Sequence, residues 1–550
     1  MIRSLISAML GCTFLYACST ASGEKFARAS NDTERPKLVV GIVIDQFRND
    51  YMQRYAHQYN GGFKRMVDEG FYCANHHFSY VPTYTGPGHA SVYTGTTPAV
   101  HGIAANNWYD PRTKEGMYCV QDKSVRTIGI ANADGQMSPF NLKTTTITDE
   151  LMLSLNFRSK VVGMSIKDRG SILPAGHLGK AYWYSKGFMI SSSYYMEELP
   201  SWVQDFNSRG LPATYVKKGW EPLLPLDQYT SSLPDDSPYE SKWVGEEAPL
   251  LPKDLQSLVE ANGLHNVFKR TPQCNTFLLD FAKAAVLAED LGQDADTDFL
   301  CVSFSTPDYM GHAMGTRAVE IQDMYLRLDR ELGEFYDFLD QNVGKGQYTV
   351  FLTADHGAAD VPQFSMDYGL PGGYIDVKEI QEELLNALTD HHPKGATFVE
   401  KVEEDRIFLD RKAVAEAGVN YQDICDLIAY TLRMQPGIYN AYPTRDILQG
   451  GGTEWPVRNL TRGLYPPLAG DVFVVSESGW ISYGPTGTTH GTPYTYDTHV
   501  PLLLMGKGIK PGRTLRKTHI RDIAPTLSMA LDISLPSGAT GIPISEALIK

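Results

Sequence analysis

Five short runs of apolar and β-branched residues recur along the chain, and each is long enough for one strand. They are KLVVGIVID (37–45), KVVGMSI (160–166), DFLCVSFS (298–305), YTVFLTAD (348–355) and HVPLLLMG (499–506). Apolar residues follow one another without alternation in these runs, which is typical of strands covered on both faces, as in parallel sheets. The pattern therefore predicts a buried, mostly parallel sheet.

A long amphipathic segment lies between the third and fourth runs. Within residues 318–341 the apolar positions recur every three or four residues, at Ile321, Met324, Tyr325, Leu328, Leu332, Phe335 and Leu339. This is helical spacing, and a helix between two strands predicts a βαβ unit. We therefore expect an α/β fold, a doubly wound, mostly parallel central sheet with helices on both faces, whose ligands lie at the carboxyl ends of the strands.

Two stretches depart from this pattern. Residues 181–295 are rich in Tyr, Trp, Pro and Ser, and residues 366–470 combine amphipathic helix with Gly-rich turns. We interpret both as segments inserted into one domain that spans residues 37–550. The aromatic run 182–195 is typical of packing, and a place at the entrance of a site is the alternative.

The N-terminal residues have the form of an export signal. Arg3 precedes an apolar run from Leu5 to Ala17, which is too short to span a membrane. The run ends in LYAC, and small residues before Cys18 resemble a bacterial lipobox, in which cleavage leaves a lipidated cysteine; an ordinary signal peptide is the alternative. We expect residues 1–18 to be the signal and 19–36 a polar tether, in an exported protein that is periplasmic or an outer-membrane-anchored lipoprotein.

Charge limits the partners of the chain. Its 550 residues carry 49 Lys and Arg against 64 Asp and Glu, a formal net charge of -15. This balance disfavours nucleic acid and anionic lipid as main partners, and an anionic ligand would need local positive charge. The hydrophobic content of 42% is sufficient for a large core.

Five cysteines follow the signal segment, and we assign none of them to chemistry. Their spacing contains no CxxC pair, so a cysteine-rich zinc site is not expected. An odd number in an exported chain leaves at least one thiol free. The five are Cys73, Cys119, Cys274, Cys301 and Cys425.

Side chains that can bind metal follow three of the predicted strands, and a further histidine precedes the last one. Taken singly, each has another explanation: chance or capping for an Asp-x3-His pair, and a turn for a histidine in a loop of Gly and Thr. Together, three aspartates and three histidines form a mixed nitrogen and oxygen set that suits zinc. The six are Asp45, Asp308, His312, Asp355, His356 and His490.

The stretch VPTYTGPGHASVYTG (81–95) places the hydroxyl of Thr85 directly before Gly86, Pro87 and Gly88. A helix that starts here would present backbone amides and the positive end of its dipole to an anion, and glycine permits close backbone approach. Thr85 is therefore a nucleophile or a helix cap, and one residue can serve as both.

Two basic residues follow the second predicted strand. Lys167 and Arg169 are two apart in SIKDRGS, so they point the same way if the extended geometry continues. As isolated features they would be solvated surface charges. The remaining histidines near these segments are interpreted as packing residues or as neighbours of the site: His76, His77, His89, His177 and His499.

The order of these motifs resembles a known family. Asp45, TYTGPGH, VHGIAANNWYD, SIKDRGSILPAGH, DYMGH, ADHG and TTHGTPYTYDTHVPLLLMG follow one another as in the alkaline phosphatase superfamily, most closely in its PafA-type phosphate-irrepressible alkaline phosphatases. The resemblance runs from about Pro36 to the C-terminus. It implies an alkaline-phosphatase-like fold and two zinc ions, one held by Asp308, His312 and His490, the other by Asp45, Asp355, His356 and Thr85.

The resemblance also implies an activity. Zinc would make the Thr85 hydroxyl a nucleophile, and hydrolysis of phosphate monoesters of broad range would pass through a phosphothreonine. In the family, residues that match Asn106, Lys167 and Arg169 contact the transferred phosphoryl group. The expected partners are small phosphate monoesters, and we favour a monomer.

Other functions remain as alternatives. The nearest is a nucleotide pyrophosphatase or phosphodiesterase of the same superfamily, which Lys167 and Arg169 disfavour. A sulfatase would carry a Cys or Ser in a CxPxR motif, whereas this chain has Thr85 before Gly86, Pro87 and Gly88. A cofactor-independent phosphoglycerate mutase would be cytoplasmic and use serine, which the predicted export signal disfavours. An inactive, surface-anchored phosphate-binding protein is disfavoured because all six metal ligands and the hydroxyl are present. The classical alkaline phosphatases have Ser with an Arg soon after it, so their magnesium site and strong product inhibition are not expected here.

Overall fold

Residues 35–450 and 452–549 are described in the computed structural model of the chain. The predicted signal, residues 1–18, lies outside these residues, as does the predicted tether up to residue 34. No helix in the described ranges is long and apolar enough to cross a membrane.

All five predicted strands are present and lie side by side. They are β1 (Leu38–Ile44), β6 (Val161–Ser165), β9 (Asp298–Phe304), β10 (Tyr348–Thr353) and β17 (His499–Gly506), in the spatial order β17-β10-β1-β9-β6. Every residue of β1, β6, β9 and β10 is buried, as expected for continuous apolar runs. The central part of the sheet therefore follows from the apolar pattern alone.

The sheet is mostly parallel at its centre and antiparallel toward both sides. β10, β1, β9, β6 and β7 (Lys180–Ser185) pair in parallel. β17 instead runs antiparallel to both of its neighbours, β10 and β2 (Phe71–His77). The expectation that a continuous apolar run indicates parallel pairing is therefore wrong for β17, because burial depends on what covers a strand and not on its direction.

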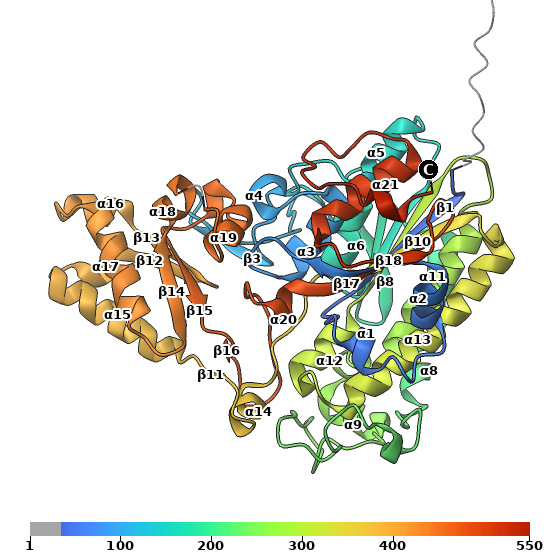
Figure 1. Ribbon diagram of the computed structural model, residues 1–550, viewed down its shortest axis with the longest axis horizontal. Coiled ribbons are helices and arrows are strands. Elements are labelled where there is room, and N and C mark those ends of the chain that lie inside the picture. The colour runs from blue at the N-terminus through green and yellow to red at the C-terminus, as the bar shows by residue number, and fades with distance from the viewer. Residues whose placement is uncertain (1–34, 451, 550) are drawn as a thin grey trace, which may run out of the picture. The chain divides into compact units, whose positions relative to one another are not determined.

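Helices cover both faces of the sheet (Figure 1). On one side lie α3 (Thr85–Thr94), α5 (Ile147–Ser154), α6 (Asp168–Ala175) and α21 (Ile523–Leu531), and on the other α2 (Gly62–Glu69), α11 (Gln273–Ala288) and α13 (Val319–Leu339). α13 is the helix predicted between the third and fourth runs, and the strands that it connects, β9 and β10, both pair in parallel with β1. The predicted doubly wound α/β fold is confirmed.

A second, smaller sheet forms within the later part of the chain. Its strands lie in the order β12 (Val399–Glu403), β13 (Arg406–Leu409), β15 (Val472–Ser476), β14 (Ile438–Pro443), all antiparallel. α15 (Val377–His391) and α17 (Tyr421–Arg433) pack on it and share a separate core that includes Leu384, Ile407 and Ile428. Most of this unit lies within the predicted insertion 366–470, and β15 lies beyond its end.

The predicted insertion 181–295 begins inside the central sheet. β7 and its antiparallel neighbour β8 (Phe188–Ser192) are strands of that sheet. Tyr182 and Trp183, in the aromatic run, are at most 2% exposed, so these two rings pack in the interior. A boundary at residue 181 would therefore divide β7, and the division into insertions stays a prediction.

Shorter elements complete the description. They are α1 (Tyr51–Arg54), α4 (Pro98–His101), β3 (Asn107–Asp110), β4 (Glu115–Tyr118), β5 (Thr127–Ile128), α7 (Ser201–Ser208), α8 (Leu211–Val216), α9 (Leu255–Asn262), α10 (Leu264–Phe268), α12 (Thr306–Met314), α14 (Pro362–Asp367), β11 (Gly373–Tyr374), α16 (Arg411–Glu416), α18 (Thr444–Gln449), α19 (Val457–Gly463), β16 (Trp480–Ile481), α20 (Thr495–Thr498), β18 (Gly512–Thr514) and β19 (Thr518–His519).

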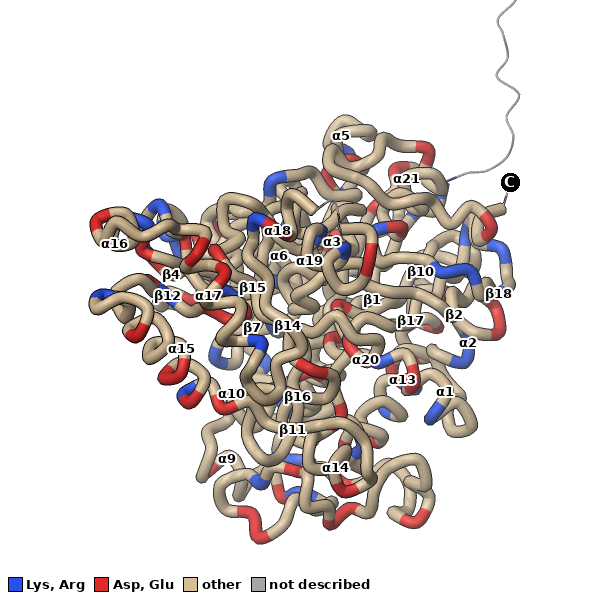
Figure 2. The backbone as a smooth tube through the Cα atoms, turned by 60° about the vertical axis from the view of Figure 1, so that its left-hand side comes forward, with Lys and Arg blue, Asp and Glu red and all other residues tan. Residues whose placement is uncertain are grey.

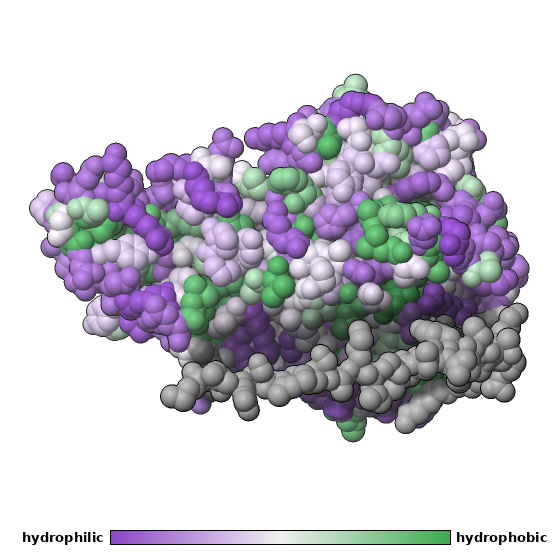
Figure 3. Space-filling model, turned by 90° about the horizontal axis from the view of Figure 1, so that it is seen from above, coloured by the Kyte–Doolittle hydropathy of each residue, from purple (hydrophilic) through white to green (hydrophobic). Residues whose placement is uncertain are grey.

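Acidic and basic residues are interspersed along the backbone, with several acidic positions on α15 (Figure 2). On the face shown in Figure 3, apolar residues form small areas among polar ones. The five cysteines are all buried and free. Since burial raises the pKa of the Cys274 thiol to about 12, this thiol remains protonated at neutral pH.

Candidate active site

Four neighbouring strands end at one edge of the sheet, and each leads into a residue of the predicted site. β10, β1, β9 and β6 are parallel neighbours, so their carboxyl ends lie together. Asp45 directly follows β1, and Asp355 follows β10 by two residues. Asp308 lies in the first turn of α12 after β9, and Lys167 precedes α6 after β6. The fold thus gathers side chains that are far apart in the sequence.

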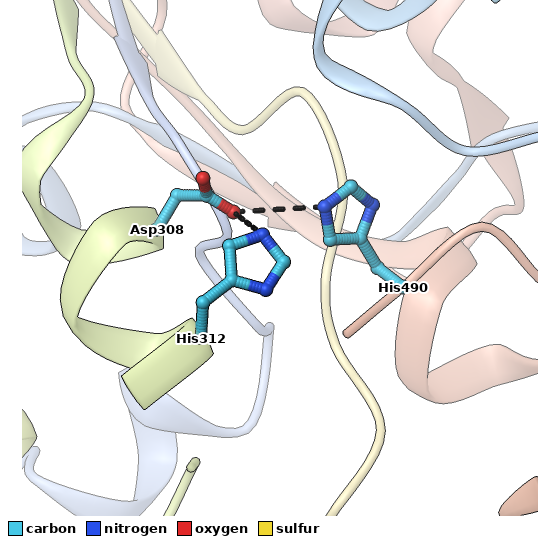
Figure 4. Close-up of side chains that lie close together, drawn as sticks. All are labelled: Asp308, His312 and His490. Atoms are coloured by element: carbon cyan, nitrogen blue, oxygen red, sulfur yellow. Dashed lines mark ion pairs between the residues drawn. The ribbon is translucent and has the colours of Figure 1, made fainter. Parts of the chain in front are cut away.

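Asp308, His312 and His490 form the first of two groups (Figure 4). Asp308 and His312 are one turn apart on α12, whereas His490 comes from the loop before α20. The Nε2 atoms of His312 and His490 lie 3.2 and 3.6 Å from Asp308 Oδ1. Ligand atoms of the three residues lie within 4.8 Å of one another, which is close enough for all three to bind one ion.

Asp45, Asp355 and His356 form the second group, again with ligand atoms within 4.8 Å of one another. All three side chains are 0% exposed. His356 Nε2 lies 3.3 Å from Asp45 Oδ1 and 3.6 Å from Asp355 Oδ2. The six predicted metal ligands therefore fall into the two sets of three that the resemblance implies.

The histidines of both groups are oriented by backbone carbonyls. His312, His490 and His356 each direct Nδ1 at a carbonyl oxygen, at 2.8, 2.7 and 2.9 Å. A carbonyl oxygen can only accept a hydrogen bond, so Nδ1 carries a proton in each ring, and Nε2 is the nitrogen that a metal ion would bind in place of a proton. Such contacts hold metal-binding histidines in their ligating tautomer. The carbonyls belong to Thr488, Thr83 and Gly357.

Two buried carboxylate oxygens of the second group test whether these residues fit a metal ion. Asp45 Oδ1 and Asp355 Oδ2 are buried and accept no hydrogen bond from the described residues. Burial and the charge of Asp45 raise the pKa of Asp355 well above its usual range. Without a cation this carboxyl group therefore favours its neutral form, whereas a divalent cation would stabilise the carboxylate. The donor atoms are nitrogen and oxygen, so the residues fit zinc.

Within the second group, Asp45 is the carboxylate that stays ionised. Burial and Asp308 raise the pKa of Asp45, whereas Lys167 and His356 lower it, and the result is about 2. Burial lowers the pKa of His356, but Asp355 and Asp45 raise it to about 9. The second group is therefore a strongly coupled cluster of buried charges.

Thr85 is the first residue of α3, and its hydroxyl faces the second group and Lys167. Tyr84 is the N-cap residue, and no side chain caps this helix, so the alternative of Thr85 as a helix cap is wrong. Thr85 Oγ1 instead lies 3.4 Å from His356 Nε2 and 3.4 Å from Lys167 Nζ. The hydroxyl is thus directed at the site and not at its own backbone.

The backbone amides at the start of α3 are less available than expected. The Gly86 N–H donates to Asn106 Oδ1 at 2.8 Å, the Gly88 N–H donates to Tyr84 O at 2.8 Å, and Pro87 has no N–H. These three positions therefore present no free amide, and Thr85 lies at the positive end of the helix dipole. Because Asn106 accepts through its oxygen, its NH₂ group remains free to donate.

Lys167 bridges the two groups. Its Nζ donates to Asp45 Oδ2 at 2.6 Å and to Asp308 Oδ2 at 2.5 Å. Lys167 is 5% exposed, so it is not a solvated surface charge. Burial lowers the pKa of Lys167, but Asp308 and Asp45 outweigh burial and hold it above the usual value.

Arg169 lies beside Lys167, but not by extended geometry. The extended backbone ends at Lys167 and α6 begins at Asp168, so the expected continuation of the strand is wrong. Arg169 Nη1 donates to Tyr118 Oη at 2.9 Å, while its buried Nε finds no partner among the described residues. The guanidinium therefore has donors left for a ligand.

Gln46 is a neighbour of both groups that the sequence analysis missed. Its Nε2 donates to Asp308 Oδ1 at 2.8 Å, and its backbone N–H donates to Asp355 Oδ1 at 3.2 Å. It adopts a positive φ of 63°, which is uncommon for a residue other than glycine. The only signal in the sequence was its place directly after Asp45.

The remaining histidines lie outside the two groups. His89 is nearest, with Nδ1 2.9 Å from Thr85 O and Nε2 2.8 Å from Ser303 Oγ, so it supports the start of α3. His77 and His499 stack on each other at 4.3 Å between ring centroids. His177 contacts Asp149, and His76 contacts Thr518.

Comparison with known proteins finds a matching family model and relatives that align with nearly the whole chain. The model of the family Type I phosphodiesterase / nucleotide pyrophosphatase matches residues 39–500. Alkaline phosphatase PhoV of Synechococcus elongatus is 44% identical over 94% of this chain and 93% of its own length. Alkaline phosphatase PafA of Elizabethkingia meningoseptica is 41% identical over 97% of this chain and 98% of its own.

A solved structure extends the likeness to three dimensions. The crystal structure of wild-type alkaline phosphatase PafA matches with a TM-score of 0.90 and 42% identity, over 94% of this chain and 99% of that chain. The family model and the full-length relatives agree with the motifs quoted from the sequence. The chain therefore belongs to the Type I phosphodiesterase / nucleotide pyrophosphatase family of the alkaline phosphatase superfamily, in which it is a PafA-type alkaline phosphatase.

Proposed function

We propose that this alkaline phosphatase uses two zinc ions and hydrolyses a broad range of phosphate monoesters through a covalent phosphothreonine on Thr85. The position of the Thr85 hydroxyl carries the proposal, because Oγ1 lies 3.4 Å from both His356 Nε2 and Lys167 Nζ. Relatives named alkaline phosphatases support hydrolysis of monoesters.

The proposed reaction has two displacements. Thr85 loses its hydroxyl proton to solvent and its Oγ attacks phosphorus, while the bond to the ester oxygen breaks on the opposite side and the alcohol takes up a proton. Water then attacks the phosphothreonine and releases inorganic phosphate and Thr85. Bound zinc would supply Lewis acidity that favours the ionised hydroxyl and neutralises phosphate charge. One ion would be held by Asp45, Asp355, His356 and Thr85, and the other by Asp308, His312 and His490.

Three side chains would hold the phosphoryl oxygens. Arg169 can bind two oxygens through its fork, and Lys167 acts as a compact charge between the two groups. Asn106 would donate through its NH₂ group, since its oxygen already accepts the Gly86 N–H. This number of donors suits a monoester, which carries about two negative charges near pH 7.

The alternative is preferential hydrolysis of nucleotide pyrophosphates or phosphodiesters. The match to the family model of that name favours it, because the model covers residues 39–500. Diester hydrolysis would use the same six metal ligands and Thr85. Lys167 and Arg169 would then have one charged phosphoryl oxygen fewer to contact. The ratio of kcat/KM for an aryl phosphate to that for the matching methyl aryl phosphate separates the two functions, and a ratio far above one supports the proposal.

Gly88→Ala tests the metal assignment through the second group. A Cβ at Gly88 would lie 2.4 Å from Asp355 O and 2.7 Å from Asp355 Cβ, so alanine must displace this proposed ligand. We expect metal affinity at the second group to fall about 10- to 100-fold or more. Elemental analysis after gel filtration would then find two zinc ions per unaltered chain and one in the variant.

Gly116→Ala is the matched control, because a Cβ at Gly116 meets nothing within 4 Å. It should keep both ions and the activity. An unaltered protein without zinc, or a Gly88→Ala variant that keeps two ions, would contradict the assignment.

We also propose that the protein is exported and lipidated at Cys18, which rests on residues 1–18 and the LYAC motif alone. The mass of the N-terminal peptide of the native protein tests this. A peptide that starts at a lipidated Cys18 is expected, a plain cleaved terminus would support an ordinary signal peptide, and an N-terminus at Met1 would contradict export by cleavage.

A further inference from the structure

A cavity of about 450 Å³ lies next to the proposed site. Its walls come from the second sheet, from α15 and from the loop that carries His490. Most lining side chains are apolar, among them Ile380, Leu384, Phe473, Val475 and Trp480. The volume is within the usual range for a small-molecule pocket, roughly 300–1,000 Å³.

The cavity reaches the proposed site at His490 and at Tyr84, the residue before Thr85. Both residues line the cavity, and His490 belongs to the first group. The Tyr84 and His490 rings meet edge to face, with centroids 5.7 Å apart. The cavity therefore adjoins the first group, on the side of His490.

The proposed reaction predicts which part of the substrate lies on the His490 side of the site. In an in-line displacement the ester oxygen leaves opposite the attacking oxygen. Thr85 Oγ1 lies near His356 of the second group, so the alcohol would leave toward the first group, which contains His490. The organic part of the substrate then extends beyond His490, where the cavity lies.

We propose that this cavity is the binding pocket for the alcohol part of the substrate, and that it favours uncharged aromatic or bulky apolar groups. This inference rests on the proposed function, because it uses the direction in which the alcohol leaves. It adds a substrate class to the proposed function: the enzyme would accept a broad range of monoesters but prefer esters of large apolar alcohols.

The charges around the cavity exclude one competing class. Glu404 and Asp405 line it together with Arg406, and burial raises the pKa of Glu404 to about 7 and that of Asp405 to about 6, so both carboxyl groups are ionised only above about pH 7. On the solvent side, α15 carries Glu379, Glu382 and Glu383 (Figure 2). Above that pH an alcohol with further phosphate groups would be repelled by net negative charge at the cavity, whereas a neutral ring would not be repelled.

Two alkyl esters of similar chemical reactivity test the pocket. Ethyl phosphate and 2-(1-naphthyl)ethyl phosphate both release a primary alcohol, so their kcat/KM ratio reports contacts of the added ring. We expect the naphthyl ester to be favoured about 10- to 100-fold, from burial of its apolar surface. As a readout independent of turnover, calorimetry should detect binding of 2-(1-naphthyl)ethanol to the chelator-treated full-length protein.

Two variants fill the pocket from different walls, Ile380→Trp on α15 and Ser482→Trp on the exposed segment after β16. Both should bring the ratio to within about threefold of one and abolish binding of the alcohol. Leu385→Trp is the matched control, because Leu385 lies on α15, is 37% exposed and does not line the cavity. It should retain both the preference and the binding.

Failure of the pocket and failure of the proposed function look different. A ratio near one in the unaltered protein, or a preference that both filled variants keep, overturns the pocket while hydrolysis of ethyl phosphate leaves the function intact. If neither ester is hydrolysed, the function fails. In that case the alcohol can still be used to test the pocket. Binding to the unaltered protein that is lost in Ile380→Trp supports the pocket, and no binding to the unaltered protein overturns it.

Discussion

Thr85→Ala is expected to lower kcat/KM for 4-nitrophenyl phosphate by at least about 10⁴-fold, because removal of a nucleophile removes the covalent pathway. Thr85→Ser should keep much of the activity, since it retains a hydroxyl at the start of α3. Thr94→Ala is the control on the same helix, where the hydroxyl donates to Ala90 O and faces away from both groups. It should change activity little. Activity of Thr85→Ala within tenfold of the unaltered enzyme would exclude Thr85 as the nucleophile.

The covalent step gives a second measurement on the same residue. Acid quenching during turnover should trap phosphate on the peptide that contains Thr85, and mass spectrometry should place it on that threonine. Thr85→Ala should trap none. Phosphate found on a different residue would contradict the mechanism even if Thr85→Ala were inactive.

Five strands of the central sheet could be predicted because buried strands consist of continuous apolar runs in the sequence. β1, β6, β9, β10 and β17 all lie where these runs are. The direction of β17 was not predictable in this way, because apolar residues report cover and both directions can be covered. The extent of the central sheet was equally hidden, since β7 and β8 carry the aromatic residues and serines that were interpreted as an insertion.

More of the proposed metal ligands could be predicted from the sequence than of the residues around them. Asp and His side chains next to buried strands meet at one edge, so their residue types and positions predict one mixed set of metal ligands, whereas the division into two groups needed the family resemblance. Gln46 carries no such signal, because its contacts with Asp308 and Asp355 depend on a positive φ. Asn106 needed the family resemblance, and only its hydrogen bond with Gly86 shows which end of the amide is free.

Lys167→Ala and Arg169→Ala are expected to lower kcat/KM for a monoester about 10²- to 10³-fold, the cost of removing one strong donor to a transition state. The loss for the matching methyl diester should be below about tenfold. A diester has one ionisable oxygen fewer, so a cation placed for the second negative charge contributes less to it. Lys180→Ala, which removes an exposed lysine paired with Glu289, is the control and should affect neither substrate.

Metal content must be measured in the Lys167 variant, because Lys167 Nζ contacts carboxylates of both groups. Loss of zinc would lower hydrolysis of both substrates alike and would show that Lys167 acts through Asp45 and Asp308. Retained zinc with equal losses on both substrates would sink the assigned contact with the phosphoryl group. Retained zinc with a selective loss on the monoester would mean that Lys167, between the two groups, binds the second negative charge of a monoester, which a diester lacks. Recognition of this second charge would then explain why the site prefers monoesters.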